Sequence, residues 1–376
     1  MSAVTMETSA EQRLFRETNA DFVSETAAIP AVRKLHKARQ SFDRDWWSQA
    51  TELGWTSLLV PEELGGGSAS GEGVVDLASL AELLGSEVSP GPLNAVSVVL
   101  AGLTHPRAEG EHGAVIEAIM IGEKVATWVI AAPNRGWNPY EPSVTATRAG
   151  EEYILNGVAG PVEFAPDADL FLVTARSESG LVQLLVDAGA AGVTIESTGS
   201  VDLLRTFGNV TFSDVTSSSV IARGDAARAA VERQALIANL LQIAETVGGV
   251  GSVFDFTVQW GFDRYSFGRP LVSYQALKHR YADMKLWLEA CRATLAAAVA
   301  AVQAESPDAP HLVSVAKSYV TERSVQIIQD CVQLHGGLGV TTEHNLHIYL
   351  RRAMLDRQLY GSPREHRQLV AQYIGL

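Results

Sequence analysis

The sequence is poor in features that mark several specialised classes of protein. Only two of its 376 residues are cysteines, Cys291 and Cys331. Both lie in apolar patterns of helical period, which is typical of buried thiols in a reducing compartment and not of a disulfide framework. The nine histidines form no HExxH-type pattern, so the sequence indicates no metal site.

Basic residues are also scarce, and long apolar runs are missing. Lys and Arg number 29 against 43 Asp and Glu, which gives a net charge of −14 and a pI near 5.1. A nucleic-acid binder would normally carry a basic face. No uninterrupted run approaches the ~20 apolar residues of a membrane-spanning helix, and Met1 to Asp21 carries Glu and Arg through its apolar positions, unlike a secretory signal. We expect a cytoplasmic protein without nucleic-acid or membrane partners.

What the chain does contain is a hydrophobic fraction of 47%, enough for a large core divided into two or three domains. Residues 1–118 are predicted to be a helical domain, because Phe42 to Leu53 and Val74 to Leu84 show apolar residues at three- and four-residue spacing. The segment between these two helices contains Pro61 and three consecutive glycines, Gly65 to Gly67, which predict a turn.

Residues 119–224 show a different pattern, of short β-rich runs separated by Gly, Asp, Asn and Pro. Runs of this length and spacing predict an antiparallel β-domain. The predicted strands cover Thr127 to Ile130, Val144 to Arg148, Tyr153 to Asn156, Leu170 to Ala175, Val182 to Val186 and Val210 to Phe212.

Residues 225–376 return to helical patterns and predict a C-terminal four-helix bundle. The predicted fold class is therefore α+β, with an N-terminal helical domain, a middle antiparallel β-domain and the bundle. Domain interfaces favour pockets, so we expect a ligand where the β-domain meets the bundle. The predicted helices are Ala226 to Trp260, Tyr274 to Ala304, His311 to Leu334, Asn345 to Tyr360 and Glu365 to Tyr373.

Two segments within the bundle do not suit helices. Gln333 to Gly339 contains three glycines, each of which costs about 1 kcal/mol relative to alanine inside a helix. Such a cluster indicates either a helix–helix turn or a helix end opened for close contact with a ligand or another chain. Asp263 to Leu271 places two arginines around a phenylalanine and a glycine, and could clamp a pyrophosphate or simply be a solvated loop.

Taken together, these segments resemble the acyl-CoA dehydrogenase family. The matching motifs occur in the family's order over nearly the whole chain. They are Leu53-Gly54-Trp55, Val60-Pro61-Glu62-Glu63 with Gly65-Gly66, Tyr153-Ile154-Leu155-Asn156-Gly157 with Ala168-Asp169, Arg264-Tyr265-Ser266-Phe267-Gly268-Arg269-Pro270, and Gln333-Leu334-His335-Gly336-Gly337.

The resemblance implies an FAD flavoprotein of lipid metabolism, acting in fatty acid or steroid degradation and assembled at least as a dimer. It implies that several residues bind the FAD held mainly by a neighbouring subunit: Arg264, Ser266, Phe267, Gln275, Gln333, Gly336 and Gly337. The implied reaction is α,β-dehydrogenation of an acyl-CoA thioester, in which a carboxylate removes the α-proton and the β-hydride passes to the flavin. By resemblance, the electron acceptor is an electron-transfer flavoprotein.

The sequence departs from the family at the catalytic base. Many members carry the base as the glutamate of a Tyr-Glu-Gly triplet near the C-terminus, whereas the corresponding stretch here is Tyr360-Gly361. Other members, which act on steroid or other bulky acyl-CoAs, place it on the first bundle helix. Glu245, in Ala244-Glu245-Thr246-Val247-Gly248, is therefore the candidate base, with an exposed helix glutamate as the alternative. Asp356 and Glu365 are weaker candidates, which we expect to be solvated charges.

A second departure lies in the middle domain. The family's Thr-Glu-Pro flavin motif is replaced by Ala131-Ala132-Pro133, and its Trp-Ile-Thr strand by Pro161-Val162-Glu163. Either other contacts hold the flavin ring, or a different subunit supplies part of the site. Three hypotheses follow. The first is a dehydrogenase with Glu245 as base, as a homo-oligomer or a heterotetramer with a homologue, and the second is a non-catalytic or half-site subunit of a heteromer. The third keeps the fold and changes the reaction, for example to a flavin-dependent oxidase or a hydratase-like enzyme acting on a carrier-bound acyl group.

Overall fold

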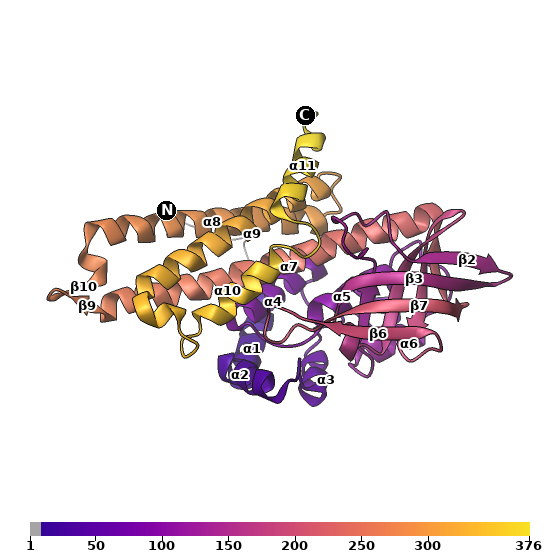
Figure 1. The fold of residues 1–376 in the computed structure, drawn as a ribbon, viewed down its shortest axis with the longest axis horizontal. Helices are drawn as coiled ribbons and strands as arrows, with labels where there is room; N and C mark the ends of the chain where they lie inside the picture. Colours follow the sequence, from indigo (N-terminus) through magenta and orange to yellow (C-terminus); the bar gives the residue numbers. More distant parts are fainter. Residues whose placement is uncertain (1–8) are drawn as a thin grey trace.

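The computed structural model describes residues 9–376, and these form three parts in chain order (Figure 1). The predicted helical domain 1–118 begins in residues 1–8, which lie outside the described part. Its helices are α1 (Ala10–Thr26), α2 (Ile29–Ala38), α3 (Arg44–Glu52), the short 3₁₀ helix η1 (Glu62–Leu64), α4 (Gly73–Glu87), α5 (Leu93–Leu103) and α6 (Gly113–Met120). In the view of Figure 1, α1, α2 and α3 lie below the bundle, and α6 lies beside the sheet.

Side-chain caps fix the first residues of several helices. Ser9 and Gln12 form a capping box at the start of α1, and Asp43 accepts hydrogen bonds from the backbone of Asp45 and Trp46 at the start of α3. These caps satisfy amide groups that have no partner inside the helix. The turn predicted around Pro61 is confirmed, because η1 ends at Gly65 with a φ of +82°.

The middle part is a single eight-stranded sheet in the order β6-β7-β3-β2-β4-β5-β8, with β1 paired to β4. The sheet is mixed and not purely antiparallel as predicted, because β1 and β2 both run parallel to β4. Its strands are β1 (Ala126–Val129), β2 (Thr145–Ala149), β3 (Glu152–Glu163), β4 (Leu170–Ser177), β5 (Gly180–Asp187), β6 (Val193–Thr198), β7 (Phe207–Ser217) and β8 (Val220–Arg223). The short helix η2 (Ala165–Asp167) follows β3.

The bundle confirms the predicted helices to within a few residues at most ends. α7 (Gly224–Asp263) runs through the centre of the molecule, and a short hairpin of β9 (Tyr265–Ser266) and β10 (Arg269–Pro270) follows it. The remaining elements are η3 (Leu271–Ser273), α8 (Gln275–Gln303), α9 (Ala309–His335), η4 (Gly336–Val340), α10 (Leu346–Asp356) and α11 (Pro363–Tyr373). Cys291 and Cys331 are buried free thiols, as predicted.

Two bundle helices, α7 and α8, are long and apolar enough by length and composition to cross a membrane, which the sequence analysis did not recognise. In the folded protein, 89% of the most apolar 18-residue stretch of α7 is buried. The core therefore accounts for the apolar character of α7.

Helix α7 crosses α4 at backbone contact distance. A Cβ atom at Gly85 would overlap the backbone carbonyl oxygen of Glu245, and one at Gly248 would overlap that of Glu82. Only glycine allows two helices to approach so closely. The two helix backbones are therefore in contact beside Glu245, and the hollow that remains there between α4 and α7 has a volume of only about 10 Å³.

Candidate functional site

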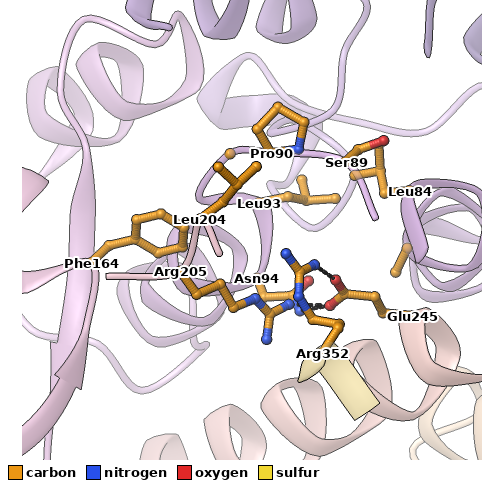
Figure 2. Close-up of a pocket in the computed structure, with 12 residues that line it drawn as sticks. Leu84, Ser89, Pro90, Leu93, Asn94, Phe164, Leu204, Arg205, Glu245 and Arg352 are labelled. Atoms are coloured by element: carbon orange, nitrogen blue, oxygen red, sulfur yellow. Dashed lines mark hydrogen bonds and ion pairs between the residues drawn. The ribbon is translucent and has the colours of Figure 1, made fainter. Parts of the chain in front are cut away.

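Glu245 lies at the junction of the three parts of the chain, on the middle of α7. Its exposed fraction is 5%, so the alternative of an exposed helix glutamate is wrong. The carboxylate faces a small pocket whose apolar walls include Leu84, Leu93, Phe164 and Leu204 (Figure 2). The pocket volume is about 20 Å³, which is room for roughly one water molecule.

Both carboxylate oxygens of Glu245 are bound by buried guanidinium groups (Figure 2). Arg205 Nη2 donates to Oε2, and Arg352 Nη1 donates to Oε1. Asn94 Nδ2 donates a further hydrogen bond of 3.2 Å to Oε2. The two arginines therefore compensate the buried charge of Glu245, as a buried carboxylate requires.

Arg205 connects Glu245 to two further acids. Its Nη1 lies 3.0 Å from Asp356 Oδ1 on α10, and its Nε lies 3.3 Å from Glu163 Oε1 at the end of β3. The loop that carries Arg205 is fixed by Asp202, whose Oδ1 accepts from the backbone amides of Leu204 and Arg205 at 2.8 and 2.9 Å. Arg205 thus joins the sheet, α7 and α10 at one point.

Arg352 on α10 completes the network from the other side. Its Nε lies 2.6 Å from Asp202 Oδ2, while its Nη1 holds Glu245. One carboxylate of Asp202 therefore orders both the Arg205 loop and the Arg352 side chain. We call the set of Glu163, Asp202, Arg205, Glu245, Arg352 and Asp356 the junction network.

Asp356 is fully buried, so the expectation that it is a solvated charge is wrong. Burial raises its pKa to about 7, against the opposing charges of Arg205 and Arg352. Burial likewise lowers the pKa of Lys317 to about 7, and its Nζ donates to Gln242 and to the Asp356 carbonyl, the latter at 2.7 Å. The other weak candidate, Glu365, is half-buried and caps α11 by accepting from Ser362.

The end of β3, where the resemblance places the flavin ring, is filled by side chains of this chain. Glu163 is buried, and Tyr360 Oη lies 3.3 Å from its Oε2. The ring of Trp137 packs edge-on against Tyr360 and Trp128, with centroids 5.4 and 6.2 Å apart. Burial raises the pKa of Glu163. A buried acid and packed aromatic rings do not fit an isoalloxazine ring at this place.

The residues predicted to bind FAD lie instead at the opposite end of the bundle, around the β9–β10 hairpin (Figure 1). All of them are exposed except the half-buried Ser266. Phe267 is 98% exposed and has a φ of +48°, which is unusual for a large aromatic residue. Exposed apolar neighbours extend this surface: Phe262, Tyr265, Leu338 and Val340. Such an apolar patch is typical of an interaction surface.

Contacts between helix ends bring the two predicted FAD-binding segments together. Trp260 near the end of α7 stacks on His335 at the end of α9, with ring centroids 5.1 Å apart, and its Nε1 donates to the Leu334 carbonyl at 3.3 Å. Gly336 ends α9 with a φ of +61°. This is a helix C-terminus, whose dipole disfavours a bound phosphate.

Comparison with known proteins identifies the family. Residues 9–107 match the profile of the acyl-CoA dehydrogenase N-terminal domain, and residues 228–375 match that of the C-terminal domain. The chain belongs to the acyl-CoA dehydrogenase family, as the sequence motifs predict. It is thus an oxidoreductase of a family whose cofactor is FAD.

Individual relatives extend over almost the full chain. Acyl-CoA dehydrogenase IpdE2 of Mycolicibacterium smegmatis is 30% identical over 367 residues, which cover 97% of this chain and 99% of the relative. Isobutyryl-CoA dehydrogenase of Dictyostelium discoideum is 27% identical over 377 residues, covering 96% and 88%. Among solved structures, butyryl-CoA dehydrogenase of Megasphaera elsdenii superposes with a TM-score of 0.89 at 19% identity, covering 99% and 100%.

Sequence reasoning singled out Glu245 but missed both of its arginine partners. Arg205 lies in a loop more than 35 residues upstream in the sequence, and Arg352 follows an exposed arginine in a helix of ordinary composition. Glu163 was recognised only as a departure from the flavin motif. One signal in the sequence could have indicated this network. The family motifs are lost at two positions, Glu163 and Gly361, and both lie beside the same buried network.

Acid titration should expose the contribution of Asp202 to stability. Burial by itself would raise the pKa of Asp202, but Arg352 and its hydrogen bonds lower it from 3.8 to about 2. A lowered carboxylate pKa stabilises the fold above pH ~4, and this stabilisation is lost as the pH falls through 2. Asp202→Asn should therefore cost about 2 kcal/mol at pH 7 and progressively less below pH ~4, with most of the difference gone at pH 2.

Urea unfolding at a series of pH values from 7 to 2 measures this difference. Asp255→Asn, at an exposed position on α7, serves as the control and should follow the wild-type curve. A constant deficit of Asp202→Asn across the whole pH range would contradict the prediction, because it would reflect lost packing and not lost charge.

Proposed function

We propose that this chain is a half-site subunit of a heteromeric FAD-dependent acyl-CoA dehydrogenase. In this proposal its bundle end, with Arg264, Phe267 and Gln333, holds the FAD of a homologous partner subunit, while its own acyl site is closed. The single observation that carries the proposal is the occupation of both Glu245 oxygens by Arg205 and Arg352 beside a pocket of about 20 Å³.

Two further observations support closure of this chain's own site. The glycine crossing of α4 and α7 brings the two helix backbones into contact at Glu245, so an acyl chain cannot pass between the two helices at that point. Trp137, Tyr360 and Glu163 fill the end of β3. The half-site reading also explains why the motif losses concentrate there while the motifs of the bundle end are kept.

The competing hypothesis keeps Glu245 as the catalytic base of a complete site. In its favour, Glu245 is buried, lies at the junction of the domains and faces apolar walls, as a base acting on a weakly acidic carbon requires. This hypothesis needs Arg205 and Arg352 to release the carboxylate and α4 to move when the substrate binds. For either function the proposed substrate class is a bulky or steroid-type acyl-CoA, with an electron-transfer flavoprotein as acceptor.

Glu245→Gln in the assembled heteromer separates the two functions. Glutamine keeps the size of the side chain and cannot accept the α-proton as a carboxylate does. Under the half-site proposal, dehydrogenation should stay within about threefold of wild type, since a change of less than ~1 kcal/mol is expected for a residue outside the reacting site. Loss of a general base would cost at least about 100-fold.

The experiment needs a control for assembly, because Glu245 also stabilises two arginines. Size-exclusion chromatography and flavin content of the variant heteromer should match wild type before rates are compared. A rate loss of 100-fold or more in a fully assembled, flavin-loaded heteromer would overturn the half-site proposal and support Glu245 as the base.

A further inference from the structure

A second concave site shares no lining residue with the Glu245 pocket. It is a groove between the end of α5, the first half of α7 and the turn that joins α8 to α9. Its volume is about 480 Å³, within the range of roughly 300–1,000 Å³ that is usual for small-molecule sites.

The lining of the groove includes apolar side chains and several prolines. Leu59, Ala101, Leu236 and Val302 contribute apolar surface. Four prolines, whose φ angles are fixed, lie along the lining: Pro61, Pro106, Pro307 and Pro310. The fixed φ angles restrict the backbone around the groove, which lowers the entropic cost of ordering it on binding.

One guanidinium group in this groove lacks a counter-ion. Arg233 on α7 is half-buried, and its Nη1 donates to the Val302 carbonyl at 3.2 Å. Within residues 9–376, no carboxylate oxygen lies within 4.0 Å of Arg233. Burial lowers the pKa of Arg233, and the charge of Glu305 opposes that shift only from a distance. Because partly buried charges are normally paired, the remaining donors of Arg233 are suited to an anion.

Three other titratable residues line the groove beside Arg233. Glu232 and Glu305 also line it, but both are exposed to solvent, which screens their charge. His105 is half-buried, and its pKa is lowered first by burial and then by the charges of Arg107 and Arg233. The lining thus combines apolar side chains with one guanidinium that has no carboxylate partner within 4.0 Å among residues 9–376.

We propose that this groove binds an apolar monocarboxylate. Arg233 pairs with the carboxylate, and the hydrocarbon tail packs on apolar lining residues such as Leu59 and Leu236. Arginine offers a forked donor set that matches the two oxygens of a carboxylate. The site is separate from the dehydrogenation chemistry, so it does not rest on the half-site proposal.

Two probes with the same tail and opposite head groups test the proposal on the full-length chain. Sodium decanoate and decyltrimethylammonium are titrated separately, well below micelle formation, and binding is followed by ligand-observed NMR. We expect saturable binding of decanoate and a Kd for decyltrimethylammonium at least tenfold weaker. Arg233→Gln should weaken decanoate binding about 10- to 100-fold, as expected for loss of a charge-assisted hydrogen bond, and should abolish the preference between the probes.

Two further variants keep the test decisive. Arg228→Gln alters an exposed arginine five residues earlier on α7 that stacks on Tyr140 and does not line the groove, so it should bind decanoate like wild type. Ala229→Trp fills the groove and should block both probes even if Arg233→Gln fails to fold. No saturable decanoate binding, equal affinity for the two probes, or decanoate binding unchanged in Arg233→Gln or Ala229→Trp would overturn the proposal.

Discussion

Replacing Arg352 by methionine is expected to lower the free energy of unfolding by about 3–5 kcal/mol, the usual cost of breaking a buried ion pair by removing one partner. Arg352 is buried and binds Glu245 and Asp202. Without Arg352, the buried carboxylates of Glu245 and Asp202 lose part of the positive charge that compensates their own charge. Asp202 then also loses its ion pair with Arg352, which positions its carboxylate to accept from the backbone amide of Arg205.

The neighbouring arginine provides a matched control. Arg351 is exposed and donates to the Val201 carbonyl at 3.1 Å, so Arg351→Met should change stability by no more than about 0.5 kcal/mol. Chemical denaturation of both variants gives the comparison. If the account of the junction network is correct, adding Glu245→Gln and Asp202→Asn to Arg352→Met should recover part of the loss, because the uncompensated charges are removed. Equal effects of the two arginine substitutions would contradict it.

Arg264→Gln is expected to reduce FAD affinity of the assembled heteromer by about 10- to 100-fold, the equivalent of one charge-assisted hydrogen bond. Arg264 caps the end of α7 beside Trp260 and is exposed in the single chain. Its substitution should leave the stability of the isolated chain unchanged. The expected result is therefore a loss of cofactor from the complex without loss of fold.

Titration of the flavin-free heteromer with FAD, followed by flavin fluorescence, measures this effect. Arg269→Gln is the control, because it lies in the same hairpin but its guanidinium stacks on Tyr274 at 3.8 Å from the ring centroid. A similar loss in both variants would show that the hairpin's net charge matters and not a specific contact. An unchanged affinity in Arg264→Gln would remove this residue from the proposed FAD surface.

The fold was predictable from local patterns because its long elements have strong periodicity. Helices α7, α8 and α9 were expected within a few residues of their ends, since each buries a continuous apolar stripe over many turns. Two strands were missed for local reasons. β6 alternates between half-buried and exposed residues at the sheet edge, and β8 is only four residues long. The parallel pairings of β1 and β2 with β4 depend on tertiary packing, which no short run encodes.

The candidate site was predictable only in part. Glu245 stood out because a lone acid among small and apolar residues on a helix is unusual, and it is indeed buried. Its partners could not be inferred, because Arg205, Arg352 and Asp356 come from a loop and a helix distant in sequence. The size of the pocket was also beyond reach, since it depends on the glycine crossing of α4 and α7. The exposure of Phe267 agrees with a partner-facing surface, but the roles of the predicted FAD-binding residues remain predictions.

Flavin content of the purified chain, alone and with a co-expressed homologous subunit, tests the half-site proposal most directly. The visible absorbance spectrum gives the ratio of FAD to protein in each preparation. We predict a colourless protein when the chain is purified alone and one FAD for each pair of unlike chains in the heteromer. A chain that by itself binds one FAD per subunit and dehydrogenates an acyl-CoA would contradict the proposal.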